Sequence, residues 1–176
     1  MKHVKGLSKL FIVAALFVAS CDDDDDNNTN TALNDADKNF MTMAAYANHN
    51  EIDFAEMALT KATADTVKTF AHMMIAEHTK AMNELDSIAN QFSYTLPDTI
   101  DSLHAVKKTD LMAKSGYSFD TAYINGQVID HQATISLFQN EASQGNNVSV
   151  KNWANKTLTN LQTHLAAADS IQNFLE

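Results

Sequence analysis

The 176-residue sequence contains few of the residues that interrupt helices, form cross-links or recognise polyanions. It has one proline and four glycines, and this scarcity of helix-breaking residues favours long uninterrupted helices. Its single cysteine, Cys21, rules out a disulfide within the chain, so a packed core must stabilise the fold. It has no arginine and a formal net charge of −10. Nucleic acid and other polyanions are therefore not expected as partners.

The only long apolar run of the chain lies near its start. Residues 1–20 contain three lysines and then the ten-residue run LFIVAALFVA, whereas a helix needs about 20 apolar residues to span a bilayer. This pattern is typical of a signal peptide. The run ends in VASC, which resembles the lipobox of bacterial lipoproteins, whose cysteine is lipidated and becomes the mature N-terminus. Cys21 is therefore the predicted lipid attachment site; an ordinary secretory signal with an incidental thiol is the alternative.

Residues 21–37 contain the acidic, low-complexity stretch DDDDDNNTNTALNDAD, which predicts a disordered tether. Removal of residues 1–20, with three lysines and no acidic residue, lowers the formal charge from −10 to −13. The lipid on Cys21 is therefore the expected contact with a bilayer. The predicted location is the bacterial cell envelope, with the outer membrane favoured. Acidic residues after the cysteine resemble surface-export signals in some lineages and inner-membrane retention signals in others, so the leaflet stays open.

Residues 38–176 form the predicted domain. Four segments repeat apolar residues at alternating steps of four and three, the spacing of one helix face. They run from about Asp37 to Lys61, Ala64 to Phe92, Phe119 to Ser143 and Val150 to Leu175. Short connections make two antiparallel hairpins, and the long crossover contains a short predicted helix, residues 98–114, that ends at Gly116. The predicted fold is all-α, a four-helix bundle with one crossover.

Each of the four apolar faces contains one residue that can bind a metal: Glu51, His78, His131 and His164. Helices rise about 1.5 Å per residue, so the two members of each hairpin lie level to within roughly 5 Å. An unpartnered buried polar group costs about 1 to 3 kcal/mol, so four at one level must satisfy one another. They can enclose one divalent metal ion. Alternatively, they can form a Glu51–histidine hydrogen-bond cluster that fixes the helix register.

Imidazole with one carboxylate suits zinc, copper or iron. Because ligand bonds need deprotonated imidazoles, binding should weaken as the pH falls through about 6. No nucleophile or second acid–base pair is evident, so metal storage, sensing or a structural metal is favoured over an enzyme. The alternative is a non-catalytic envelope module that binds a partner or acts in stress, with a purely structural cluster.

His49, His72 and His104 lie off the apolar faces and are expected to be solvated.

The sequence resembles a known family over about residues 38–172. The matching pieces are EIDFAEMA, VKTFAHMMIAEHTKAMNEL, SYTLP, SGYSFDTAYINGQVIDHQATISLF and LQTHLAAA. Their order and spacing are similar to those of the bacterial envelope proteins called domain of unknown function 4142, in the ferritin-like group of folds. The resemblance implies a bundle and an envelope location but assigns no activity.

The chain departs from the di-iron members of the ferritin-like group. Their sites need a Glu-x-x-His pair on each of two helices. Here Ile75, Val128 and Leu161 stand three residues before the histidines. One carboxylate and three imidazoles provide too few anions for two irons, so ferroxidase and iron-storage chemistry are disfavoured.

The lipidation motif generates a first prediction. The mature protein should begin at a lipidated Cys21 and partition with membranes, because the apolar run ends in VASC. Cys21→Ser should move the protein from the detergent phase to the aqueous phase in a detergent-partition assay. A serine variant that still enters the detergent phase, or a mature N-terminus elsewhere, would contradict this prediction.

Overall fold

The computed structural model describes residue 1 and residues 32–175. The predicted signal peptide, Cys21 and most of the tether lie outside the described residues, apart from Met1. Five helices and no strand occur in the described part of the chain: α1 (Asp35–Lys61), α2 (Asp65–Gln91), α3 (Ser102–Met112), α4 (Gly116–Gln144) and α5 (Val148–Leu175). The all-α prediction is confirmed.

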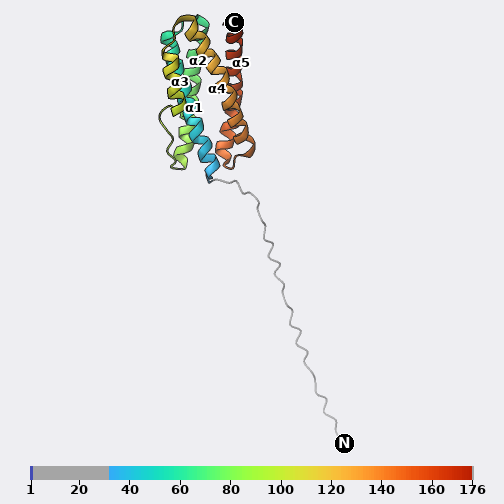
Figure 1. Ribbon diagram of the computed structural model, residues 1–176. Helices are drawn as coiled ribbons and strands as arrows, with labels where there is room; N and C mark the ends of the chain where they lie inside the picture. The colour runs from blue at the N-terminus through green and yellow to red at the C-terminus, as the bar shows by residue number, and fades with distance from the viewer. Residues whose placement is uncertain (2–31, 176) are drawn as a thin grey trace.

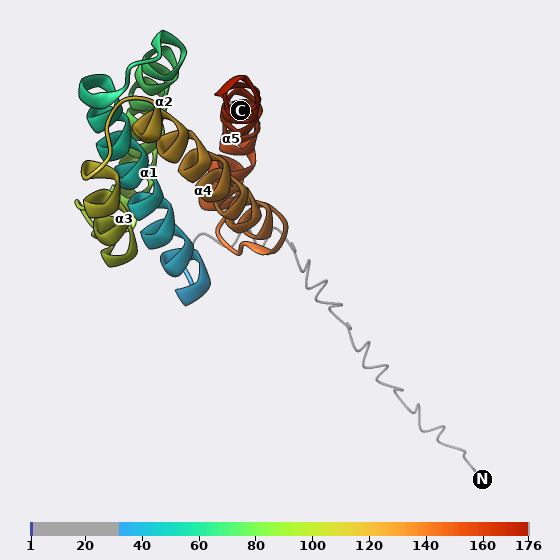
Figure 2. The ribbon, with the colours of Figure 1, turned by 45° about the horizontal axis from the view of Figure 1, so that its top comes forward.

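Two long hairpins form the bundle (Figure 1). α1 pairs with α2 and α4 pairs with α5, and the hairpins meet through contacts of α1 with α4 and of α2 with α5. The short helix α3 packs on the outside against α1 and α4, away from α5 (Figure 2). The predicted four-helix bundle with one crossover is therefore confirmed. Among the described helices, none combines the length and apolar character required to cross a membrane.

The structure differs from the sequence expectation at two helix ends. α1 begins at Asp35, so the last residues assigned to the tether are helical. A capping box explains this start: the backbone N–H of Asp37 donates to Asn34, and the backbone N–H of Asn34 donates to the Asp37 carboxylate, at 2.8 and 2.9 Å. Gly116, expected to end the short helix, instead begins α4 with a φ of +57°. Glycine adopts this left-handed conformation without steric cost.

Polar residues separate the apolar core into two parts. One cluster lies near the α1–α2 turn and includes Phe70, Phe119 and Tyr123. The other lies near the α4–α5 turn, where Phe40 contacts Phe138 edge-on at 5.0 Å between ring centroids. Between them lie buried polar side chains from all four long helices: Asn48, Glu51, His78, Gln127, His131 and His164. This polar layer is the region that the sequence marked as a candidate site.

A pair of buried carboxyl groups lies at the end of the bundle where α1 starts. Asp37 accepts hydrogen bonds from the backbone N–H groups of Asn146 and Asn147 in the α4–α5 turn, at 2.9 and 3.1 Å. Glu141 lies beside it, and burial and then the proximity of Asp37 raise the pKa of Glu141 to about 7. A Cβ at Gly145 would clash with the carboxyl group of Glu141. A residue without a side chain is therefore needed at position 145, because the carboxyl group of Glu141 occupies this space.

This pair predicts a pH-dependent stability. The folded-state pKa of Glu141 lies above its ordinary value of 4.5. The contribution of Glu141 to the free energy of unfolding is therefore fully present below about pH 4.5 and is lost as the pH rises through about 7. Glu141→Gln cannot ionise and should raise the free energy of unfolding at pH 8 by about 2 kcal/mol, with little gain at pH 5. Urea unfolding at both pH values measures the difference. The exposed Glu56→Gln is the control, and equal gains at the two pH values would contradict the prediction.

Candidate metal centre

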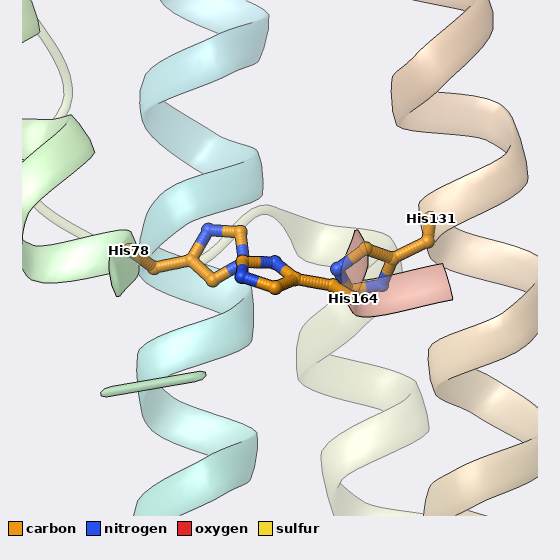
Figure 3. Close-up of side chains that lie close together, drawn as sticks. All are labelled: His78, His131 and His164. Carbon is orange, nitrogen blue, oxygen red and sulfur yellow. The ribbon is translucent and has the colours of Figure 1, made fainter. Parts of the chain in front are cut away.

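Three histidines from three helices meet in the polar layer. His78 of α2, His131 of α4 and His164 of α5 are 4, 1 and 2 % exposed. One ring nitrogen from each lies within 4.8 Å of the other two, and the rings converge from separate helices (Figure 3). The ring centroids are 5.8 Å apart for His78 and His131, 5.1 Å for His78 and His164, and 5.5 Å for His131 and His164.

Hydrogen bonds on the outer side fix the protonated nitrogen of the first two rings. The amide nitrogen of Asn48 donates to the Ala44 carbonyl, so its oxygen faces Nδ1 of His78 at 2.9 Å and must accept from it. Nδ1 of His131 lies 2.9 Å from the backbone carbonyl of Gln127, which can only accept. Both rings therefore carry their proton on Nδ1, and each has a bare lone pair on Nε2.

The third ring presents its other nitrogen. Nε2 of His164 lies 3.0 Å from the carboxylate of Glu77 and donates to it, which leaves the lone pair on Nδ1. The inner nitrogens are thus Nε2 of His78, Nε2 of His131 and Nδ1 of His164, and none has a hydrogen-bond partner among the described residues. Three acceptor lone pairs cannot satisfy one another. Left unpartnered, each would cost about 1 to 3 kcal/mol.

The spacing of the rings suits one metal ion. Imidazole nitrogens bind zinc at about 2.0–2.1 Å, so three rings around one ion have centroids about 5.2 to 5.5 Å apart in tetrahedral or trigonal geometry. The observed separations of 5.1 to 5.8 Å agree with these values. One nitrogen of each ring lies within 4.8 Å of the other two, and coordination to one ion would bring the bound nitrogens to about 3.4 Å from one another, which requires an inward movement of the rings.

Burial favours the neutral, metal-binding form of two of the imidazoles, those of His78 and His164. The pKa of His78 lies well below the ordinary value of 6.5, first because of burial and then because His164 and His131 are near. The pKa of His164 is also lowered, by burial and by His131, although Glu77 opposes the shift. At His78 and His164, protons therefore compete with a metal at a lower pH than they do at free imidazole. This places the expected weakening of metal binding below the pH of about 6 inferred from sequence.

Glu51 takes a different place from the one expected of a fourth ligand. One carboxylate oxygen accepts a hydrogen bond from the side-chain amide of Gln127 at 2.6 Å. The other lies 3.6 Å from Nδ1 of His131, the outer nitrogen of that ring. Helix α1 presents Asn48 toward α2 and Glu51 toward α4, so the carboxylate lies behind a ligand rather than among the inner nitrogens. Burial raises its pKa, against the opposing effects of His131 and Gln127.

Sequence reasoning missed the residues that orient the rings. Residue 127 orients His131 through its backbone carbonyl, which any residue one helical turn earlier would present, so this contact leaves no signal in the sequence. Glu77 is adjacent to His78 in the sequence, but its carboxylate contacts His164 of α5. Asn48 had no signal beyond being a polar residue beside an apolar face. Such partners fix the tautomer and orientation of metal-binding histidines.

The expectation that His104 is solvated was wrong. Its side chain is 15 % exposed, with Nδ1 2.6 Å from Asp101 and Nε2 3.5 Å from Asp130. Burial lowers its pKa, but these two carboxylates outweigh burial and raise the pKa above 6.5. The short helix α3 is therefore attached to the bundle by charged contacts close to the polar layer.

The fold and the buried polar layer define a helical bundle of the ferritin-like type in which three buried histidines could hold a metal. The family model described as "Domain of unknown function (DUF4142)" matches residues 24–171. The chain therefore belongs to this family, as its sequence resemblance indicated. The comparison with curated proteins finds no match.

Solved structures of other proteins share the fold. The crystal structure of a DUF305 fragment from Deinococcus radiodurans has a TM-score of 0.72 at 11 % identity, covering 80 % of this chain and 97 % of that chain. CopM in the Cu(II)-bound form has a TM-score of 0.68 at 18 % identity, covering 80 % and 97 %. CopM in the Ag-bound form has a TM-score of 0.64 at 19 % identity, covering 78 % and 95 %. At these identities the likeness concerns the fold.

The hydrogen bond behind His78 generates a prediction. Asn48→Ala removes the acceptor for Nδ1, so the ring is free to turn and to expose the wrong nitrogen. Metal affinity should fall about 10- to 100-fold. Asn48→Asp keeps an acceptor oxygen for Nδ1 but loses the donor to the Ala44 carbonyl, so it should lose less affinity than Asn48→Ala. Competition titration with a chromogenic chelator measures both variants, and equal losses in the two would show that the orientation of His78 does not matter.

Proposed function

We propose that this domain binds one metal ion at His78, His131 and His164, in a storage, sensing or structural role. The observation that carries the proposal is the convergence of three buried rings, with one nitrogen of each within 4.8 Å of the other two. The inner nitrogen of each ring has no hydrogen-bond partner in the described chain. A bound ion would accept all three lone pairs at once. It would thereby remove the desolvation cost of three buried acceptors.

The chemistry of the site favours copper, with zinc and iron as the other candidates. Neutral imidazoles suit all three metals, and divalent copper binds nitrogen ligands more tightly than zinc or iron does. The CopM structures, described as Cu(II)-bound and Ag-bound, lend the fold a precedent for copper and silver. The carboxylates of Glu51 and Glu77, which lie behind two of the rings, would offset the charge of a divalent ion.

We propose further that the domain is anchored to a membrane of the bacterial cell envelope by a lipid on Cys21. The support is the apolar run, the VASC motif and the acidic stretch that follows. The outer membrane is the favoured location. In this arrangement the acidic residues would separate the bundle from the bilayer, and the metal would be bound outside the cytoplasm.

A structural role for the histidine cluster is the second candidate. In that case a proton shared between inner nitrogens would take the place of the metal, and the cluster would serve only to fix the helix register. The hydrogen bonds of the outer nitrogens to Asn48, Gln127 and Glu77 are compatible with this reading too. Metal analysis separates the two candidates.

The test uses the domain purified without an affinity tag. We expect one metal ion per chain by elemental analysis, and we expect the melting temperature to fall on chelation and recover with added copper or zinc. His78→Leu should abolish metal binding while preserving apolar packing, so its melting temperature should ignore chelator. His72→Leu, on the exposed face of the same helix, is the matched control. Absence of stoichiometric metal, with a melting temperature unaffected by copper, zinc and iron, would defeat the proposal.

A further inference from the structure

A metal ion that binds at the centre must cross a closed surface, because the three histidines are at most 4 % exposed. A cavity of about 230 Å³ lies between α1, α3 and α4. Its lining includes the polar side chains of Asn50, Glu51, Asp101, His104, Asp130 and Thr134. Glu51 is the member of this lining that contacts a ring of the centre, at 3.6 Å from His131.

Carboxyl side chains outnumber basic side chains in the lining of this cavity. Three carboxylates line it, those of Glu51, Asp101 and Asp130, and the basic side chain among its lining residues is His104. His104 lies 2.6 Å from Asp101 and 3.5 Å from Asp130. Lys107 offsets only Asp130, with its ammonium group at one oxygen of that carboxylate. Acidic clefts with low-dielectric walls raise the local concentration of cations and their association rates.

The inner end of the cavity holds an incompletely satisfied carboxylate. Glu51 is only 5 % exposed, and Gln127 donates to one of its oxygens. The other oxygen has no hydrogen bond in the described structure, because Nδ1 of His131 donates to the Gln127 carbonyl instead. A buried carboxylate with a free oxygen, in a cavity beside a metal centre, is suited to hold a cation transiently.

We propose that this acidic cavity captures the metal ion and is its route to the three-histidine centre, with Glu51 as the last carboxylate before His131. The proposal rests on the proposed function and adds a path to it. The outer carboxylates of Asp101 and Asp130 attract the hydrated ion, and Glu51 replaces part of its water before the histidines bind it. Glu51 is thus a transfer residue at the cavity floor, behind the ring of His131.

The opposite face offers the competing route. Glu77 lies between α2 and α5, its side chain is 41 % exposed, and it bonds to Nε2 of His164. A route past Glu77 would reach the same centre, but it would not pass through the cavity that three carboxylates line. The two routes separate experimentally because they lie on different faces of the bundle.

The test blocks the cavity and measures the rate of loading. Ala133 is exposed and lines the cavity, two residues after His131; Ala166 is exposed, two residues after His164, and is not among the cavity's lining residues. Stopped-flow loading of the metal-free domain with copper(II) or zinc should be at least tenfold slower in Ala133→Trp. Release to a chelator should slow by the same factor, so the dissociation constant stays unchanged. Ala166→Trp should load at the normal rate.

A second variant removes charge without adding bulk. Asp101→Asn keeps an N-cap side chain for α3 and should load severalfold more slowly at low salt, with the difference vanishing at high salt. This variant decides the matter if Ala133→Trp does not fold. Unchanged loading in both cavity variants, or equal slowing in Ala166→Trp, would overturn the route while leaving metal binding intact. If the unaltered domain binds no metal at all, the proposed function fails together with the route.

Discussion

The structure depends on one electrostatic constraint, the convergence of three bare imidazole nitrogens in a layer shielded from water. Asn48, the Gln127 carbonyl and Glu77 each hold a ring proton on the outer side. The inner nitrogens are consequently all acceptors, and a cation between them could satisfy all three at once. The carboxylates of Glu51 and Glu77 lie behind His131 and His164, on the side of each ring away from the centre. They could balance the positive charge of a bound ion inside the protein.

This layer also explains why the apolar core has two parts. Aromatic and aliphatic side chains fill both ends of the bundle, and the polar layer crosses all four long helices between them. Sliding one helix by a turn would bury an imidazole or a carboxylate against hydrocarbon, which costs several kcal/mol when the group is unpartnered. The same residues that can bind a metal therefore specify the register of the helices.

The helices and the histidine cluster could be predicted because both follow from periodicity. A four-three repeat identifies the inward face, and the rise per residue gives the height. Periodicity does not resolve neighbouring positions on that face: Met82 and Ala89 of α2 are buried, whereas Ala81 and Ile88 beside them are partly exposed. Consecutive residues of a helix differ by about 100° in direction, so periodicity gives only an approximate direction for each side chain. It therefore could not decide whether Glu51 points at the centre as a ligand or lies behind His131. Contacts between residues distant in sequence, such as His104 with Asp130, leave no periodic signal.

The ligands are divided unequally between the hairpins, with His78 on the first and His131 and His164 on the second. An ion held by all three would act as a non-covalent cross-link between two halves that the chain joins only through the crossover and α3. Its removal would first loosen the docking of one hairpin on the other, before either hairpin lost its own helical pairing. The strength of the contact between the two hairpins would then depend on how much metal is available to the protein.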